Sequence, residues 1–200
     1  MLNKLFPLAC VVLASGIGQR FGANKLLAQH GKQPLVQHIL DISENIFCER
    51  VVVTRHAEIA RLCRERSLHC ILHNQPYLND TVRLGTEYIE ASQASIQGLL
   101  FATADQPLLQ RATLIRLCQS FLEQPEKIHR LYYHTTPGNP IIFPRRLIPE
   151  LKALPQDKGG SNLIKKYPEL VVPLQAQEEC ELFDVDTQED WQLLLQRTKA

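Results

Sequence analysis

A chain of 200 residues, 44% of them hydrophobic, is long enough to bury one substantial core and short for two full domains. Its 22 lysines and arginines balance 21 acidic residues, which leaves a formal net charge of +1. The basic residues are spread along the sequence, and this argues against a nucleic-acid-binding surface. We therefore expect one domain and no nucleic-acid partner.

The first residues raise the question of a signal peptide, because Lys4 precedes the largely apolar run Leu5–Ala14. The apolar stretch before Cys10 is shorter than the roughly 7–15 residues of a signal-peptide core. No other stretch approaches the ~18 apolar residues of a membrane span. The six cysteines form no C-x-x-C pair, which favours buried, reduced thiols. We expect a buried first strand and a cytoplasmic protein with no membrane partner.

Short apolar runs alternate along the chain with segments of helical periodicity. The predicted strands are Leu8–Leu13, Arg50–Thr54, His69–Leu72, Gly98–Thr103, Ile128–Tyr133, Ile141–Phe143, Leu170–Leu174 and Leu182–Val185. The predicted helices are Pro34–Phe47, Ala57–Arg66, Asp80–Ser92, Ala112–Leu122, Arg146–Leu154, Gly160–Lys166 and Gln188–Arg197. The alternation predicts a three-layer α/β fold with a mostly parallel sheet. After Lys127 prolines interrupt the pattern, and we expect that part to lie over the edge of the sheet.

A glycine-rich segment, Leu13-Ala-Ser-Gly-Ile-Gly-Gln-Arg-Phe-Gly-Ala-Asn-Lys25, follows the first predicted strand. Its glycines let the backbone approach an anion closely, and Arg20 and Lys25 add positive charge. The segment matches neither G-x-G-x-x-G, because Phe21 stands at the third glycine, nor a Walker A loop, because two residues separate Gly22 from Lys25. We interpret it as a cradle for a nucleoside triphosphate. A tight strand–helix connection with incidental charges is the alternative.

Two aspartates are candidate ligands of Mg²⁺. Asp105 follows a predicted strand and so belongs to the edge of the sheet where α/β proteins bind ligands, as does the glycine-rich segment. Asp186 follows Leu182–Val185, where Asp184 and Asp186 would share one face of a strand. Mg²⁺ takes one or two protein carboxylates and completes its shell with phosphates and water. The alternatives are an ordinary turn at Asp105 and helix capping by Asp186 or Thr187.

Two polar, turn-rich stretches, Gly138-Asn-Pro140 and Gln156–Asn162, flank the apolar residues Ile141–Phe143. They are candidates to receive a second substrate, although surface turns are the favoured interpretation. The histidines show no H-E-x-x-H spacing, and no G-x-S-x-G occurs. These absences argue against zinc hydrolases and serine esterases.

Four segments, taken in order, resemble the molybdenum cofactor cytidylyltransferase family, a branch of the MobA-like NTP transferase superfamily. They are Leu13–Lys25, Ala104-Asp-Gln-Pro107, Gly138–Pro144 and Asp184–Thr187. The first is close to the family signature L-A-A-G-x-G-x-R-F-G-x-x-K, with Ser15 where alanine is usual. The chain departs from the family at Asn139, where histidine is usual, and in the stretches 74–85 and 156–161. These departures fall in regions expected to meet the acceptor or the base.

The resemblance implies a Rossmann-like nucleotidyltransferase fold and a set of site residues. The nucleotide-binding residues would be Leu13, Ala14, Ser15, Gly16, Gly18, Arg20 and Lys25. Asp105 and Asp186 would hold Mg²⁺, and Lys25, Arg20 and Asp105 would be catalytic. If the two aspartates lie about 5 Å apart, their repulsion is about 3 kcal/mol at an effective dielectric near 20, and bound Mg²⁺ would relieve it.

The resemblance also divides the single domain, residues 1–200, into two parts. Residues 1–125 would bind the nucleotide. Residues 126–200 would supply the second metal ligand and bind the acceptor, with Gly138, Asn139 and Pro140 as candidate acceptor contacts.

The implied reaction joins CTP to the terminal phosphate of molybdopterin and releases pyrophosphate. An acceptor oxygen would attack the α-phosphorus in line, so catalysis would rest on positioning and charge stabilisation. A recipient molybdoenzyme or its chaperone is a further candidate partner. The alternatives are a GTP- or CTP-dependent transferase for another small phosphate such as a sugar phosphate, and a non-catalytic carrier of the molybdenum cofactor. A dinucleotide-dependent reductase is disfavoured by the failed glycine fingerprint.

Overall fold

Strand β1 (Phe6–Ala14) lies in the middle of a sheet that is covered on both faces. Its side chains at Leu8, Cys10 and Val12 belong to one hydrophobic cluster, and those at Ala9 and Val11 belong to another. Successive side chains of a strand point to opposite faces, so a strand that is apolar throughout needs cover on both sides. The chain therefore folds into three layers, as expected.

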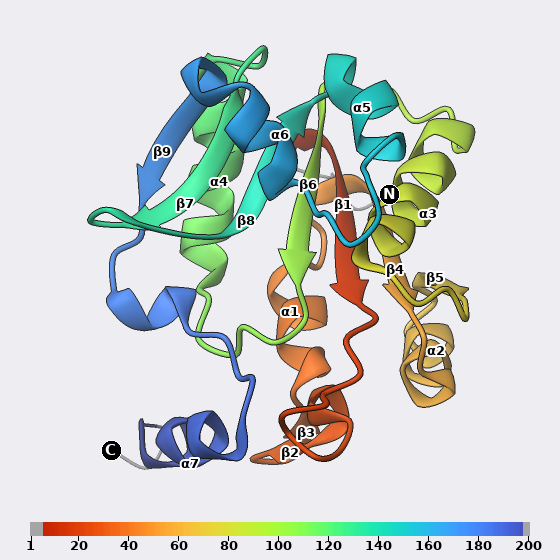
Figure 1. The fold of residues 1–200 in the computed structure, drawn as a ribbon, viewed down its shortest axis with the longest axis vertical. Helices are drawn as coiled ribbons and strands as arrows, with labels where there is room; N and C mark the ends of the chain where they lie inside the picture. The colour runs from red at the N-terminus through yellow and green to blue at the C-terminus, as the bar shows by residue number, and fades with distance from the viewer. Residues whose placement is uncertain (1–5, 198–200) are drawn as a thin grey trace.

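The computed structural model describes residues 6–197, and their seven-stranded sheet has the order β5-β4-β1-β6-β8-β7-β9 (Figure 1). The other strands are β4 (Phe47–Thr54), β5 (His69–Leu72), β6 (Gly98–Thr103), β7 (Ile128–Tyr133), β8 (Thr136–Pro144) and β9 (Val171–Gln175). Strand β8 runs antiparallel to its neighbours β6 and β7, while the other pairings are parallel. The predicted α/β fold with a mixed, mostly parallel sheet is confirmed. A separate two-stranded hairpin consists of β2 (Gln29–His30) and β3 (Gln33–Pro34).

Helices pack on both faces of the sheet. One hydrophobic cluster includes residues of α1 (Val36–Ile42), α2 (Ala57–Glu65), α4 (Arg111–Glu123) and α7 (Gln188–Arg197). The other includes residues of α3 (Leu78–Ala91), α5 (Ile148–Lys152) and α6 (Ser161–Lys166). Short 3₁₀ helices are η1 (Lys25–Leu27), η2 (Arg145–Leu147), η3 (Pro168–Leu170) and η4 (Glu179–Leu182).

The predicted helix Pro34–Phe47 is too long at both ends. Pro34 belongs to β3, and the helix covers only Val36–Ile42. Asn45 then adopts a φ of 58°, a left-handed conformation that a helix cannot contain. Strand β4 consequently starts at Phe47, three residues before the predicted start at Arg50.

The part of the chain after Lys127 does not lie over the edge of the sheet. Strands β7, β8 and β9 extend the same sheet beyond β6. The register between β7 and β8 shifts between Arg130 and Tyr132. Such an irregularity accommodates proline, which has no N–H to donate to a ladder. Gly138, Asn139 and Pro140 therefore lie within β8 and not in the surface turn that we favoured from the sequence.

The predicted strand Leu182–Val185 is wrong. Leu182 ends the 3₁₀ helix η4, and the residues after it pair with no strand among those described. The segment crosses the ends of the parallel strands, and its Val185 N–H donates to the carbonyl oxygen of Asp105 at 3.0 Å. The alternation of burial survives, since Val185 is fully buried between Asp184 and Asp186, which are not. Asp186 therefore lies at the edge of the sheet, although the segment that carries it is not a strand.

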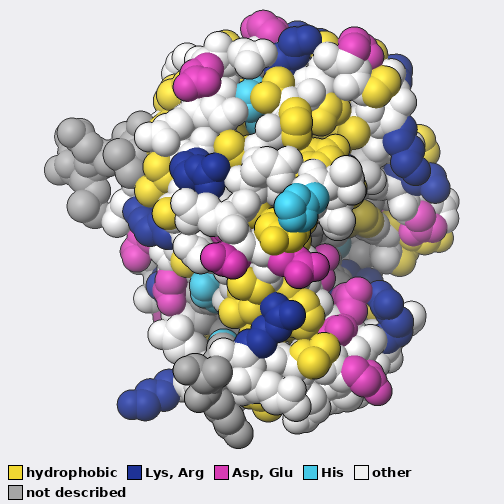
Figure 2. Space-filling model, turned by 90° about the vertical axis from the view of Figure 1, so that its left-hand side faces the viewer, with side chains coloured by type: hydrophobic (Ala, Val, Ile, Leu, Met, Phe, Trp, Pro, Cys, Tyr) yellow, Lys and Arg dark blue, Asp and Glu magenta, His cyan; other side chains and the backbone are white. Residues whose placement is uncertain are grey.

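The surface and the thiols agree with the bulk composition. Basic and acidic side chains are interspersed on the face that Figure 2 shows, and no large area of one charge forms there.

All six cysteines are free, and Cys10, Cys63 and Cys118 are buried. Between residues 6 and 197, no helix is long and apolar enough to cross a bilayer. The cytoplasmic location stays a prediction.

Candidate active site

The glycine-rich segment forms a tight turn between β1 and η1. Gly18 and Gly22 adopt φ values of 61° and 79°, and a Cβ atom on Gly18 would meet the Ala23 carbonyl oxygen at 2.2 Å. The N–H groups of Phe21 and Gly22 both donate to the Gly18 carbonyl oxygen, at 2.9 and 3.0 Å. Only glycine fits this turn at position 18. After this turn the chain runs back toward the sheet, and the side chain of Lys25 is buried there.

Lys25 joins two acidic side chains that are far away in the sequence. Its Nζ atom donates to Asp105 Oδ2 at 2.7 Å and to Asp186 Oδ1 at 2.7 Å. The side chain of Lys25 is 8% exposed, whereas those of Asp105 and Asp186 are 20% and 40% exposed. Arg20 donates to the other oxygen of Asp186 at 2.8 Å. The structure thus brings together the four charged residues that the sequence singled out.

Electrostatics within this cluster favour the charged forms of Lys25 and Asp186. Burial disfavours a charged Lys25, but the charges and hydrogen bonds of Asp105 and Asp186 outweigh it, so the pKa of Lys25 lies above its usual value. The hydrogen bond from Lys25 is the main reason why the pKa of Asp186 is lowered. The repulsion expected between Asp105 and Asp186 is therefore already relieved by Lys25.

A third acid, Asp184, lies close to this cluster. Surrounding protein atoms, and then the negative charges of Asp105 and Asp186, raise the pKa of Asp184 to about 7. In the part of the chain from Phe6 to Arg197, no group of three or more His, Cys, Asp and Glu side chains is arranged to hold a metal ion. The Mg²⁺ prediction therefore concerns two carboxylates, Asp105 and Asp186.

The two carboxylates are chemically suited to a divalent cation. Asp105 Oδ1 is buried and has no hydrogen-bond partner among the described residues. A buried carboxylate oxygen without a partner requires an explanation, and a cation is one that fits its chemistry. Helix capping does not occupy Asp186, because Thr187 Oγ1 accepts from the Asp190 N–H at 3.1 Å and so caps α7. The carboxylate of Asp186 is left for Lys25 and Arg20.

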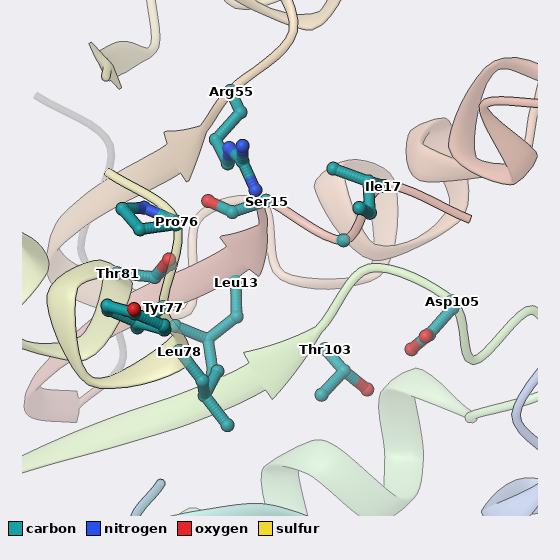
Figure 3. A pocket seen from close by; sticks show the side chains of 11 residues that line it. Leu13, Ser15, Ile17, Arg55, Pro76, Tyr77, Leu78, Thr81, Thr103 and Asp105 are labelled. Atoms are coloured by element: carbon teal, nitrogen blue, oxygen red, sulfur yellow. The ribbon is translucent and has the colours of Figure 1, made fainter. Parts of the chain in front are cut away.

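A cavity of about 310 Å³ opens beside Asp105 (Figure 3). In this view, Tyr77 and Leu78 lie on one side of the cavity and Asp105 lies on the other, while Leu13 and Thr103 lie at or next to the last residues of β1 and β6. The lining residues are Leu13, Ser15, Gly16, Ile17, Arg55, Pro76, Tyr77, Leu78, Thr81, Thr103 and Asp105. A second cavity of about 330 Å³ is lined by the glycine-rich turn, from Gly16 to Arg20, with Lys25 and Asp186.

Sequence reasoning did not single out Arg55, nor the individual residues Pro76, Tyr77, Leu78 and Thr81 within the stretch 74–85 that was expected to meet the acceptor or the base. Arg55 directly follows β4, so the rule that ligands bind at the carboxyl ends of parallel strands could have identified it. For the start of α3 the departure from the family pattern indicated the region, but Tyr77 and Leu78 belong to no motif that would identify them individually.

Ser15 anchors the glycine-rich turn to the neighbouring strand. Its hydroxyl donates to the Val53 carbonyl oxygen at 3.2 Å and lies 2.9 Å from His73 Nε2. The Gln75 N–H donates to His73 Nδ1, so the proton of this imidazole is on Nε2 and points to Ser15. Burial, followed by the charge of Arg55, lowers the pKa of His73 and keeps the ring neutral. The serine that replaces the usual alanine is thus held by two partners within the protein.

A further cavity, of about 210 Å³, adjoins the first and shares Leu13, Leu78 and Thr103 with it. The rest of its lining is Val82, Phe101, Arg130, Asn139, Ile141, Phe143, Gly159, Gly160 and Ser161. Gly159 and Gly160 are close-packed, since a Cβ atom on them would meet Leu78 at 2.8 Å and Phe143 at 2.7 Å. The end of the stretch 156–162 therefore lines a cavity, contrary to the surface turn that we favoured.

The three predicted acceptor residues have different places around this last cavity. Asn139 lines it. Gly138 contributes its carbonyl oxygen, which accepts from Arg130 Nε at 2.9 Å, and Pro140 is buried within β8. Burial lowers the pKa of the Arg130 guanidinium. Sequence reasoning did not identify Arg130, because a single arginine within a strand carries no motif.

Comparisons with known proteins agree with this fold. Residues 10–171 match the model of the MobA-like NTP transferase domain, and a search of curated proteins found no match. Rv0371c from Mycobacterium tuberculosis is similar in structure, with a TM-score of 0.81 and 23% identity over 94% of this chain and 98% of that one. A structure of Rv0371c in complex with manganese has a TM-score of 0.73 and 19% identity, over 94% of this chain and 98% of that one.

Two further solved structures share the fold. A nucleotidyl transferase from Methanothermobacter thermautotroptrophicus has a TM-score of 0.78 and 18% identity, over 95% of this chain and 96% of that one. The molybdopterin-guanine dinucleotide biosynthesis protein A from Archaeoglobus fulgidus has a TM-score of 0.72 and 16% identity, over 96% of this chain and 98% of that one.

Proposed function

Because the chain belongs to the MobA-like NTP transferase domain family, we propose that it is a nucleotidyltransferase that transfers CMP from CTP to the terminal phosphate of molybdopterin. The observation that carries the proposal is the Lys25 ammonium group, held between Asp105 and Asp186 beside the glycine-rich turn. Cations and acids at one edge of a parallel sheet are what binding a triphosphate with a divalent cation requires.

The donor nucleotide would occupy the cavity beside Asp105 and the cavity of the glycine-rich turn, which share Gly16 and Ile17. The apolar side chains of Leu13, Tyr77 and Leu78 suit a base and ribose in the cavity beside Asp105. Arg20 and Lys25 line the adjoining cavity, where they would neutralise the triphosphate. Leu13, Ala14, Ser15, Gly16 and Gly18 would shape this part of the site through the backbone.

The reaction needs no nucleophile from the protein. An oxygen of the acceptor phosphate forms a bond with the α-phosphorus of CTP, and the bond from that phosphorus to pyrophosphate breaks. Lys25 would stabilise the negative charge that is spread over the reacting phosphate, and Arg20 would hold the leaving pyrophosphate. Asp105 and Asp186 would hold Mg²⁺, which supplies further neutralisation of phosphate charge when it is bound.

The acceptor would bind in the cavity that Arg130 and Asn139 line. Its walls at Phe101, Ile141 and Phe143 are apolar, which suits the face of a flat heterocycle. Its polar groups at Arg130, Asn139 and Ser161 could meet the polar edge of such a ring. A sugar phosphate would place hydroxyl groups against apolar walls without hydrogen bonds, which is costly.

The direct test is pyrophosphate release by the purified protein with Mg²⁺, either CTP or GTP, and either molybdopterin or a sugar phosphate. We expect release only with molybdopterin, and faster release with CTP. Release with a sugar phosphate would favour the rival acceptor. Tight molybdopterin binding without release from any nucleotide would identify a carrier, and NAD(P) binding would reopen the reductase alternative.

Transfer of the product to a molybdoenzyme or its chaperone would complete the role of the protein. We also place this role in the cytoplasm, which agrees with six free cysteines.

A further inference from the structure

Cationic side chains already occupy the predicted metal ligands. Lys25 contacts one oxygen of Asp186 and Arg20 contacts the other, so both oxygens of this carboxylate are in use. Lys25 also contacts Asp105 Oδ2, and only Asp105 Oδ1 is left without a partner among the described residues. A divalent cation held by both acids would therefore share Asp186 with these two basic side chains and would lie next to the positive charge of Lys25.

The two basic side chains differ in how firmly they are held. Arg20 has a side chain that is 72% exposed, and such a surface ion pair contributes little free energy. Lys25 is 8% exposed and interacts with two acids at once. A free divalent cation that approaches Asp186 would meet the Lys25 ammonium group at short range, where like charges repel strongly. Lys25 is thus the main obstacle to binding of the metal alone.

A polyphosphate changes this balance. The cavity of the glycine-rich turn contains Arg20, Lys25 and Asp186, so phosphate groups bound there would face both cations. They would offer the Lys25 ammonium group new anionic partners and would bring ligand oxygens for the metal. Lys25 has a flexible four-carbon stem and can follow the phosphates.

We propose that Lys25 closes the metal site to free divalent cations and opens it when a nucleotide triphosphate draws its ammonium group away from Asp186. The inference rests on the proposed function, in which Asp105 and Asp186 hold the metal. It differs from a purely structural ion pair, which would stay in place with nucleotide present and whose removal would not raise the affinity of the protein for the metal alone.

Equilibrium dialysis of the full chain against Mn²⁺ tests the proposal, with and without a non-hydrolysable CTP analogue and with a protein-free correction for Mn²⁺ held by the analogue. The wild-type protein should bind Mn²⁺ weakly alone and at least about tenfold more tightly with the analogue. Lys25→Met should bind Mn²⁺ alone at least about tenfold more tightly than the wild type does. Lys32→Met, at an exposed position in the β2–β3 turn, is the matched control and should behave as the wild type.

Two outcomes would count against the proposal and can be told apart. Equal affinity of Lys25→Met and the wild type for Mn²⁺ without the analogue would overturn it, while leaving the metal role of Asp105 and Asp186 intact. If Asp105→Asn retains as much Mn²⁺ as the wild type with the analogue present, the metal role itself fails. Lys25→Gln serves as a second variant if Lys25→Met does not fold, and pyrophosphate release remains an independent test of the proposed function.

Discussion

The proposed donor and acceptor regions of this protein use a cationic side chain in opposite ways. In the donor region, Lys25 is buried and bridges two carboxylates. In the acceptor region, Arg130 donates to a carbonyl oxygen and packs 5.8 Å from the centre of the Tyr132 ring, and no carboxylate of residues 6–197 forms an ion pair with it. We therefore expect donor binding to depend on a balanced cluster of charges, and acceptor binding to depend on apolar shape and one anchoring cation.

The largest expected effect comes from removing the central charge of the donor region. Lys25→Ala should lower the rate of pyrophosphate release by roughly 100-fold or more, because one preorganised positive charge at the reacting phosphate is lost. Single-turnover measurement of pyrophosphate with saturating CTP and acceptor checks this. A rate within a few-fold of the wild type would remove Lys25 from the catalytic centre.

A smaller effect, confined to the acceptor, is expected for Arg130→Met. Loss of a charge-assisted hydrogen bond should raise the KM for the acceptor roughly tenfold and leave the KM for CTP unchanged. Initial rates at varied concentrations of each substrate separate the two values. Arg61→Met is the control, since this exposed arginine lies on α2. Equal changes in both KM values would show that the two regions are not independent.

Part of this comparison could be predicted from the sequence. The rule for carboxyl ends of parallel strands placed Lys25 and Asp105 at one edge, and it succeeded because β1 and β6 are adjacent. Asp186 was identified although its strand was wrong, because the alternation of buried and exposed residues persists without backbone pairing. Arg130 could not be found, since its position depends on a register shift between β7 and β8 that no local pattern reports.

A smaller change should follow from Ser15→Ala, which introduces the residue that is usual in the family. The Val53 carbonyl oxygen and His73 Nε2 would lose a partner, which should lower the free energy of unfolding by about 1 kcal/mol. Urea denaturation measures the loss, and Ser95→Ala at an exposed position is the control. Equal stability of the two variants would show that the Ser15 hydroxyl does not anchor the turn.

The smallest expected effect is the contribution of His129, in β7, to the pH dependence of stability. His129 is fully buried, its Nε2 donates to the Gln124 carbonyl oxygen at 3.1 Å, and burial lowers its pKa. Below about pH 6.5, His129 therefore binds a proton more readily in the unfolded chain than in the folded protein. The free energy of unfolding consequently falls as the pH drops through this range. His129→Gln should lose less stability than the wild type between pH 7 and pH 5, by about 1 kcal/mol or less. Parallel pH profiles of the melting temperature would contradict this.

The proposed function requires above all that Lys25, Asp105 and Asp186 surround the phosphates of the nucleotide. A crystal structure of the protein with CTP and Mg²⁺ tests it directly. We expect the triphosphate to lie against the glycine-rich turn, the metal to bind Asp105 and Asp186, and the base to lie in the cavity beside Tyr77. A triphosphate bound away from Lys25, with the Lys25–Asp186 ion pair unchanged, would contradict it.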